Sequence, residues 1–157
     1  MKNLITNEQV IKLAFSDGEY VSPEVVLDSD IASAADRYIV PIVGTELYEE
    51  MLGGSHTTLL DDYVAPALAM AVRTMIQPAL NVRTGQGGLY IPSSARSDTS
   101  IRTTTQALQR SLCRRRHALL KRLSNYLKRN ASQFPGYDAS HDAMQKCSIN
   151  GGYVQMR

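Results

Sequence analysis

The residues of this sequence that could do acid–base or metal chemistry are few and far apart. Three histidines, His56, His117 and His141, lie in three separate segments. None has a cysteine or a second histidine at the spacing that a zinc site needs. Asp142 follows His141, but we expect both in a polar tail that would not fix their geometry. The histidines therefore predict neither a metal site nor a general base.

Two carboxylate pairs and two cysteines are also poor candidates for chemistry. Glu49-Glu50 and Asp61-Asp62 are each adjacent in the sequence, and adjacent helical side chains diverge by about 100° rather than converge on a substrate. Cys113 and Cys147 are too few and too far apart for a disulfide framework, so we expect reduced thiols. The sequence predicts no enzyme and no cofactor.

Gly85-Gln86-Gly87-Gly88 resembles a phosphate-binding loop only weakly, because it follows a helical pattern and lacks the Gly-Lys-Ser/Thr ending. It belongs to a 17-residue connection, residues 81–97, that has no helical period. Connections of this length are usually functional or disordered. We expect a loop arm here, with residues 87–91 forming a short strand or hairpin that another copy completes. Its candidate contact residues are Gly85, Gly87, Gly88 and Tyr90.

The strongest chemical signal is a stripe of positive charge on a predicted long helix over residues 98–130. Arg110, Arg114, His117, Lys121 and Lys128 recur at spacings of 4, 3, 4 and 7, and no acid lies between Asp98 and Asp138. Three consecutive arginines spread over about 200° of a helix, so Arg115 and Arg116 should flank the apolar stripe. The candidate contact residues are Arg110, Arg114, Arg115, Arg116, Lys121 and Lys128.

The positive stripe has three alternative interpretations. They are a solvated face, a surface that binds nucleic-acid phosphates, and a surface that binds an acidic protein. Residues 1–62 hold 12 acidic and 3 basic side chains, a net charge of −9, whereas residues 63–157 hold 3 acidic and 14 basic ones, a net charge of +11. Either these halves face each other within one molecule, or the acidic face of one copy meets the basic face of the next.

Helical signals precede the long helix. Thr6 and Gln9 form a capping box for a first helix. Ser22-Pro23-Glu24 predicts a second helix start, with a break near residues 28–30. Pro41 should end or kink this helix near Ile39, and Gly44 should take a left-handed conformation. A short helix follows, and residues 58–80, of which 63–72 are apolar nearly all round, predict a buried central helix.

The predicted fold is all-α: a bundle of four to five helices with one long C-terminal helix, an extended loop at 81–97 and an extended C-terminal tail. We expect a helical domain over residues 1–130 and a polar tail or arm over 131–157. No run of eighteen apolar residues is present, so we expect no membrane contact. The expected apolar stripe of the long helix is Ile101, Leu108, Leu112, Leu119, Leu123 and Tyr126.

Residues 3–80 resemble a known family. Residues 4–10, Leu-Ile-Thr-Asn-Glu-Gln-Val, are similar to the short "ITxEE" helix that opens head–tail connector (adaptor, or head-completion) proteins of tailed bacteriophages. Residues 31–39 match the family's next helix in character. Residues 40–48, Val-Pro-Ile-Val-Gly-Thr-Glu-Leu-Tyr, resemble the "PxLGxxLY" stretch of such proteins from phages and prophages of Bacteroides-like bacteria. The alanine-rich residues 66–75 match in position.

The resemblance implies a structural virion protein, made in the bacterial host cytoplasm, without catalytic residues. It implies a homo-oligomeric ring beneath the portal, twelve-fold if bound there, which extends the DNA channel toward a tail or stopper protein. The channel DNA would be contacted without sequence specificity, and the family's partners include no membrane. The alternative, from the charge pattern alone, is a nucleic-acid-binding module that uses the basic helix 98–130.

Overall fold

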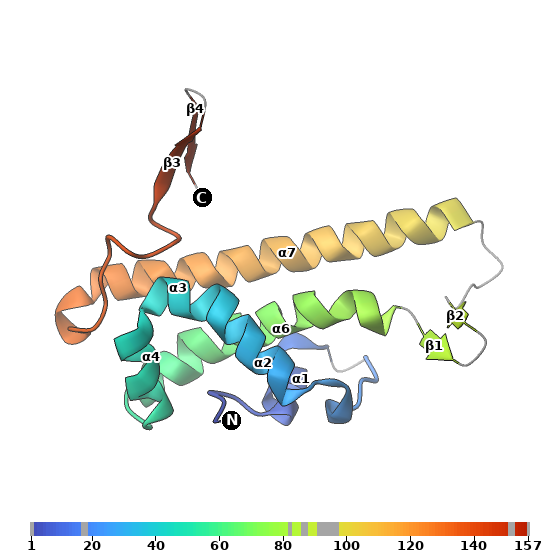
Figure 1. The fold of residues 1–157 in the computed structure, drawn as a ribbon, viewed down its shortest axis with the longest axis horizontal. Coiled ribbons are helices and arrows are strands. Elements are labelled where there is room, and N and C mark those ends of the chain that lie inside the picture. Colours follow the sequence, from blue (N-terminus) through green and yellow to red (C-terminus); the bar gives the residue numbers. More distant parts are fainter. Residues whose placement is uncertain are drawn as a thin grey trace.

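The computed structural model describes the backbone of residues 2–16, 19–81, 83–85, 88–90, 98–150 and 153–156, and the side chains of 2–16, 19–81 and 103–146. Its helices form one bundle in which α6 (Ala65–Leu80) lies beneath the long helix α7 (Asp98–Arg129) (Figure 1). Counting continuous segments, the described chain has five helices, which confirms the predicted all-α class. None of these helices is both long and apolar enough to cross a membrane.

Helix α1 (Asn7–Ala14) begins at the predicted capping box. The Thr6 hydroxyl oxygen accepts a hydrogen bond from the Gln9 backbone N–H at 3.3 Å, and the Gln9 side-chain oxygen accepts one from the Thr6 N–H at 2.8 Å. Val10 and Ala14 are buried, and α1 packs against α6. This reciprocal bonding satisfies two backbone donors that the helix end would otherwise leave without partners.

The second helix begins later than the sequence predicted. Pro23–Val25 form only an isolated 3-10 turn (η1), in which Ser22 makes no side-chain cap. Helix α2 (Asp28–Ala34) starts after Leu27, because an Asp30 carboxylate oxygen accepts a hydrogen bond from the Leu27 N–H at 3.2 Å. This bond satisfies the backbone N–H of Leu27, as the third-residue carboxylate of a capping box does.

Pro41 does not end the second helix. Helix α2 continues through a π turn, η2 (Ala35–Ile39), into α3 (Val40–Val43). The wider turn rearranges the hydrogen-bond ladder directly before Pro41, where the chain has no N–H to donate. The helix ends at Gly44, whose φ is +84° as expected in sign, but whose ψ of 161° is extended rather than left-handed helical. This region is accessible essentially to glycine alone.

A second π turn interrupts the central helix. Helix α5 (Thr57–Leu59) continues through η3 (Leu60–Val64) into α6, after the short helix α4 (Thr45–Leu52). The predicted segment 58–80 is therefore helical. Residues 67–72 of α6 are at most 1% exposed, and α6 packs against α1, α2 and α7. The predicted central position is confirmed.

The buried side of α7 differs from the predicted apolar stripe. Leu112 and Leu123 are buried as expected, but Leu108 is 37% exposed, and Leu119 and Tyr126 are only half-buried. The remaining buried leucines are Leu120 and Leu127. The predicted Ile101 side chain lies outside the described part. Besides α6, the helix α3 and the residues 60–64 that precede α6 also pack on α7.

The segment after α7 is folded onto the helices. The 3-10 turn η4 (Ala131–Gln133) leads to Phe134 and Tyr137, which are 5% and 7% exposed. The Ala143 N–H donates to the Pro41 carbonyl oxygen at 2.9 Å. The sequence placed a polar tail over residues 131–157, but residues 131–146 are packed against α3 and α7.

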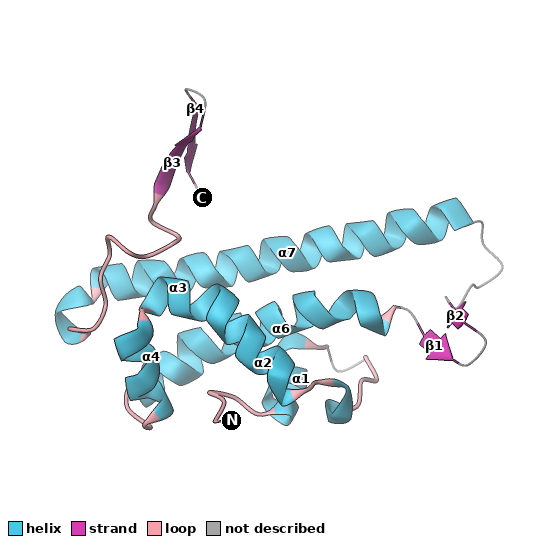
Figure 2. Cartoon of the chain, in the orientation of Figure 1, coloured by secondary structure: helices cyan, strands magenta, loops and turns pink. Residues whose placement is uncertain are grey.

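Two antiparallel hairpins extend from the helical body (Figure 2). In the first, β1 (Arg83–Gly85) pairs with β2 (Gly88–Tyr90), so the strand expected at residues 87–91 pairs within its own chain. Gly85 faces Gly88, and Tyr90 faces Arg83, while Gly87 lies outside the described residues. The second hairpin pairs β3 (Cys147–Asn150) with β4 (Tyr153–Met156).

Candidate functional site

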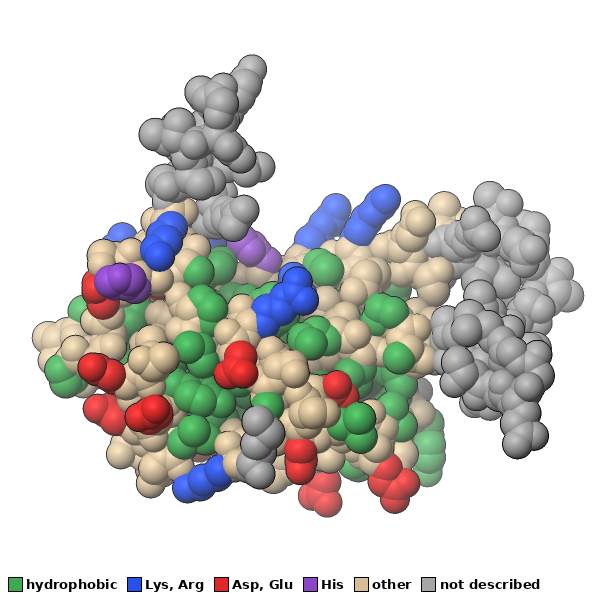
Figure 3. Space-filling model, in the orientation of Figure 1, with side chains coloured by type: hydrophobic (Ala, Val, Ile, Leu, Met, Phe, Trp, Pro, Cys, Tyr) green, Lys and Arg blue, Asp and Glu red, His purple; other side chains and the backbone are tan. Residues whose placement is uncertain are grey.

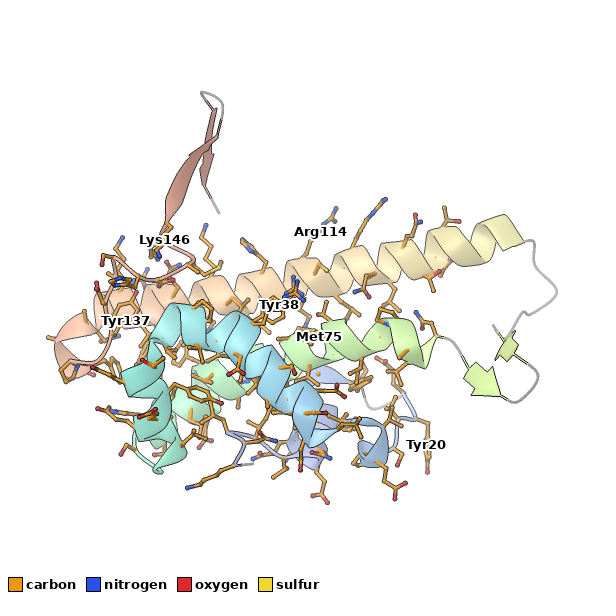
Figure 4. All side chains as sticks on the ribbon, viewed as in Figure 1. Tyr20, Tyr38, Met75, Arg114, Tyr137 and Lys146 are labelled. Atoms are coloured by element: carbon orange, nitrogen blue, oxygen red, sulfur yellow. The ribbon has the colours of Figure 1, made fainter. Side chains whose placement is uncertain are left out.

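Most of the predicted contact residues lie on the outward side of α7. Arg110, Arg114, Arg115, Lys121 and Lys128 are all exposed, and we call these five residues the basic ridge. Over residues 110–128 the ridge is about 27 Å long, from the helical rise per residue. Arg114 points away from the helical body in Figure 4. Lys128 alone among the five has a described partner, the Gln145 side-chain oxygen at 3.3 Å.

Arg116 is different from its neighbours on the ridge. Its side chain is half-buried and donates a hydrogen bond to the Tyr38 hydroxyl oxygen at 3.1 Å. The guanidinium carbon lies 4.4 Å from the centre of the Tyr38 ring. Tyr38 belongs to the π turn η2. Of the two arginines expected to flank the apolar stripe, Arg116 does so, and it meets a tyrosine rather than an acid.

A second arginine–tyrosine contact lies on the other flank of α7. The Arg122 guanidinium carbon is 4.7 Å from the ring centre of Tyr63, and Tyr63 stacks on Tyr126 with 4.0 Å between ring centres. These side chains line a groove of about 480 Å³. We call it the cationic groove, and its lining is Tyr63, Ala118, Lys121, Arg122, Asn125, Tyr126 and Arg129.

Sequence reasoning missed most of this groove. Ala118, Arg122, Asn125 and Arg129 share one side of α7 at helical spacing, which was a readable signal. Tyr63 comes from η3, more than fifty residues earlier in the chain. Its placement depends on the π turn, which no pattern in the sequence indicated.

Among the described side chains, the basic residues of α7 form no ion pair with the acidic half of the molecule. Among the described side chains the ion pairs are His56–Glu50, Arg73–Glu19 and His141–Asp138, and none involves α7. Figure 3 shows acidic side chains over α4 and along the lower edge and basic ones along the upper edge near α7, although basic side chains also appear at the lower edge and near the centre of this face. Arg73–Glu19 is the described ion pair that joins the acidic and basic halves of the sequence, and it lies outside α7.

A buried carboxylate fastens residues 137–145 to α7. Asp142 is 1% exposed, and one of its oxygens accepts hydrogen bonds from the Ser124 hydroxyl at 2.6 Å and the Tyr137 hydroxyl at 2.7 Å. The Met144 N–H donates to the other oxygen at 2.7 Å. Burial, followed by the hydrogen bond to Asp142, raises the pKa of Tyr137 above its ordinary value of 10.0. Asp142 is therefore a structural group.

The neighbouring Ser140 and His141 do not form a catalytic arrangement. The His141 Nδ1 lies 2.6 Å from an Asp138 carboxylate oxygen, and the Ser140 hydroxyl oxygen approaches that same nitrogen at 3.3 Å. In a nucleophilic triad the serine would meet the opposite ring nitrogen. Hydrogen bonds from the Ser140 N–H, then from His141 and the Ser140 hydroxyl, lower the pKa of Asp138 to about 2.

The other titratable candidates are exposed or isolated. Glu49, Glu50, Asp61 and Asp62 are all exposed, and Glu50 contacts the His56 Nε2 at 2.9 Å. His117 is exposed on α7. Among the described residues, no three His, Cys, Asp or Glu side chains lie close enough together to hold a metal ion. The side chains of the predicted loop arm, Gly85 to Tyr90, lie outside the described set.

Residues 25–146, well over half of the sequence, match a family described as a family of unknown function (DUF6712). The chain therefore belongs to this family. The match includes the basic ridge, the cationic groove and the folded segment up to residue 146. No curated protein and no solved structure matches the chain significantly.

Proposed function

We propose that this member of the DUF6712 family is a head–tail connector (adaptor) subunit of a tailed phage or prophage. In this role it forms a ring under the portal and links the capsid to the tail around the DNA channel. The observation that carries the proposal is the separation of an acidic face from the basic side of α7, without a described ion pair between them. The resemblance of residues 3–80 to connector proteins supports it.

A separation of charge suits a ring for a physical reason. A head-to-tail interface brings two different faces of each copy together, so one chain must carry both complementary surfaces. Complementary charge also steers the encounter and rejects wrong orientations. An acidic half of net charge −9 and a basic half of net charge +11 meet this requirement.

The two hairpins give the subunit places to contact other proteins. Both β1–β2 and β3–β4 are two-stranded, so each has strand edges to which another chain can add a strand. We assign them as contact arms toward the portal, the tail or stopper protein, or the next subunit. No residue of either hairpin needs a catalytic role for this.

The test is assembly of the purified protein with the portal protein of the same phage or prophage. Native mass spectrometry and negative-stain microscopy should show a ring of this chain on the portal. A ring absent from the isolated protein would be compatible with the proposal, because a template can be required. A chain that stays a strict monomer and does not bind the portal would contradict it. Portal, capsid and tail genes beside its own gene are the expected genomic context.

A second candidate function is non-specific nucleic-acid binding by α7. The exposed basic ridge favours it, because no described acid neutralises those side chains. This function predicts micromolar or tighter DNA binding with a steep dependence on salt concentration. Replacing Arg110, Arg114 and Lys121 by alanine should then abolish binding. Absence of DNA binding at low salt would exclude this function.

A further inference from the structure

The cationic groove differs from the rest of the basic surface because one of its arginines is held in place. The Arg122 guanidinium lies over Tyr63, which is itself stacked on Tyr126. An arginine stacked on an aromatic ring loses less conformational freedom when its N–H groups bind an oxyanion. Lys121 and Arg129 line the same groove, and no acid does. The groove is therefore built to receive negative charge.

Carboxylates fit this groove better than nucleic-acid bases. Proteins that hold single strands stack bases on open aromatic faces. Here Tyr63 and Tyr126 are already stacked on each other, and Arg122 also lies over the Tyr63 ring. What the groove still offers is the N–H groups of Lys121, Arg122 and Arg129, with the Asn125 side chain between them.

Suitable carboxylates lie on α4 of the same chain. Glu46 and Glu49 are three residues apart, so they share one side of the helix. Both are exposed, and neither forms an ion pair with a described cation. Glu50, the third acid of α4, is engaged with His56. Glu46 and Glu49 thus form a compact acidic surface without a described partner of opposite charge.

The groove and Glu46 belong to different surfaces of the molecule, because Glu46 lines a separate hollow with Pro41 and His141. Arg116 and Arg122 are six residues apart on α7 and so project about 120° from each other. Arg116 faces η2 through Tyr38, and η2 continues through α3 toward α4. Arg122 faces η3 through Tyr63. A groove and an acidic helix that do not share a surface can join copies head to tail.

We propose that the cationic groove of one copy binds Glu46 and Glu49 of a second copy, with Arg122 as the central contact. This inference rests on the proposed function, because it identifies the two surfaces that join neighbouring subunits of the ring. A carboxylate bound by Arg122 and Lys121 would combine charge complementarity with the two-pronged geometry that guanidinium groups favour.

A charge exchange tests the pairing. The first variant carries Lys121→Glu and Arg122→Glu, and the second carries Glu46→Lys and Glu49→Lys. Each alone places like charges across the interface, so we expect at least about a hundredfold loss of self-association at low salt. Mixed one to one, the variants restore opposite charges at every contact and should associate again. Sedimentation velocity and native mass spectrometry of the full chain measure all three samples.

Matched controls separate this pairing from general attraction. Arg110→Glu with Arg114→Glu makes the same charge change on the basic ridge outside the groove, and should reduce association far less. Arg122→Lys keeps the charge but removes the guanidinium, and should give an intermediate loss. Thermal unfolding followed by circular dichroism must show that each variant is folded.

Several outcomes would overturn the inference. They are a wild-type chain that stays monomeric at about 100 μM and low salt, a mixture that does not recover, and a ridge control as damaging as the groove variant. Duplex DNA binding that needs the groove and is unaffected by the α4 variant would identify DNA as the occupant instead. If groove variants still form rings on the portal, the pairing is wrong while the connector function stands.

Discussion

Charged side chains in the interior of the molecule have hydrogen-bonding partners, whereas those on the outward side of α7 are exposed and form no ion pair with a described acid. Inside, Arg73 is only 5% exposed; it donates to the Ala14 carbonyl oxygen, contacts a Glu19 carboxylate oxygen at 2.6 Å and lies 4.3 Å from the Phe15 ring centre. Asp142 is equally well satisfied. On the basic ridge, by contrast, Arg110, Arg114 and Arg115 are exposed and form no ion pair with a described acid.

We therefore expect the buried charged side chains to contribute to the stability of the fold, and the exposed ones to contribute little to it. A buried charge without partners is strongly unfavourable, so Arg73 and Asp142 must be surrounded by hydrogen-bonding groups. Arg73 joins Ala14 and Glu19 to α6, and Asp142 joins residues 137–145 to α7. An exposed cation carries no such requirement, and removing it should matter only when a partner is present.

The largest effect on stability should come from Arg73. Arg73→Ala removes the contact to Glu19 and leaves the Ala14 carbonyl oxygen without its buried donor. We expect a loss of about 3 kcal/mol in the free energy of unfolding. Urea denaturation measures it, with Arg110→Ala as the control, for which we expect a change within about 0.5 kcal/mol. Equal losses of stability for the two substitutions would contradict the expected difference between buried and exposed arginines.

Asp142 should have the next largest effect. Asp142→Ala leaves the hydroxyl groups of Ser124 and Tyr137 without their acceptor. We expect a loss of about 2 kcal/mol, together with faster hydrogen exchange in residues 131–146, because the segment is no longer fastened to α7. Asp138→Ala is the matched control, since its carboxylate is exposed and bonds only to nearby residues of the same turn. Exchange that is equally fast in both variants would contradict this role.

The same network predicts a dependence of stability on alkaline pH. Burial and the bond to Asp142 raise the pKa of Tyr137 in the folded state above its ordinary value of 10.0. The folded protein thus keeps the proton that the unfolded chain releases. The resulting stabilisation is complete below about pH 10 and is lost progressively as the pH rises further. Tyr137→Phe should flatten this dependence in urea denaturation between pH 8 and 11, whereas Tyr20→Phe, at an exposed residue, should not.

The smallest effect should distinguish two neighbouring arginines on α7. Arg116→Ala removes the hydrogen bond and the ring contact to Tyr38, and should cost about 1 kcal/mol. Arg115→Ala, at the adjacent exposed residue, should change stability by less than about 0.5 kcal/mol. Thermal unfolding of the two variants compares them directly. A larger loss for Arg115 would place it, rather than Arg116, in the contact with the second helix.

The sequence alone determined the helical plan of the molecule. The Thr6–Gln9 capping box, the buried segment ending at Leu80 and the long basic helix were all readable, because capping and apolar periodicity depend on nearby residues. The exposed side of α7 was readable for the same reason. Its charged residues recur at helical spacing, which can be recognised without knowing what they contact.

Only the tertiary structure decided how those helices are joined and what each polar group meets. The π turn η2 carries its helix past Pro41, and Tyr38 of η2 and Tyr63 of η3 contact two flanks of α7. Asp142, assigned by sequence to a free tail, is buried where the Ser124 hydroxyl of α7, 18 residues earlier in the chain, donates a hydrogen bond to it. Such contacts join residues far apart in sequence, so local sequence patterns cannot predict them. The basic ridge could be predicted, whereas the groove beside it required the fold.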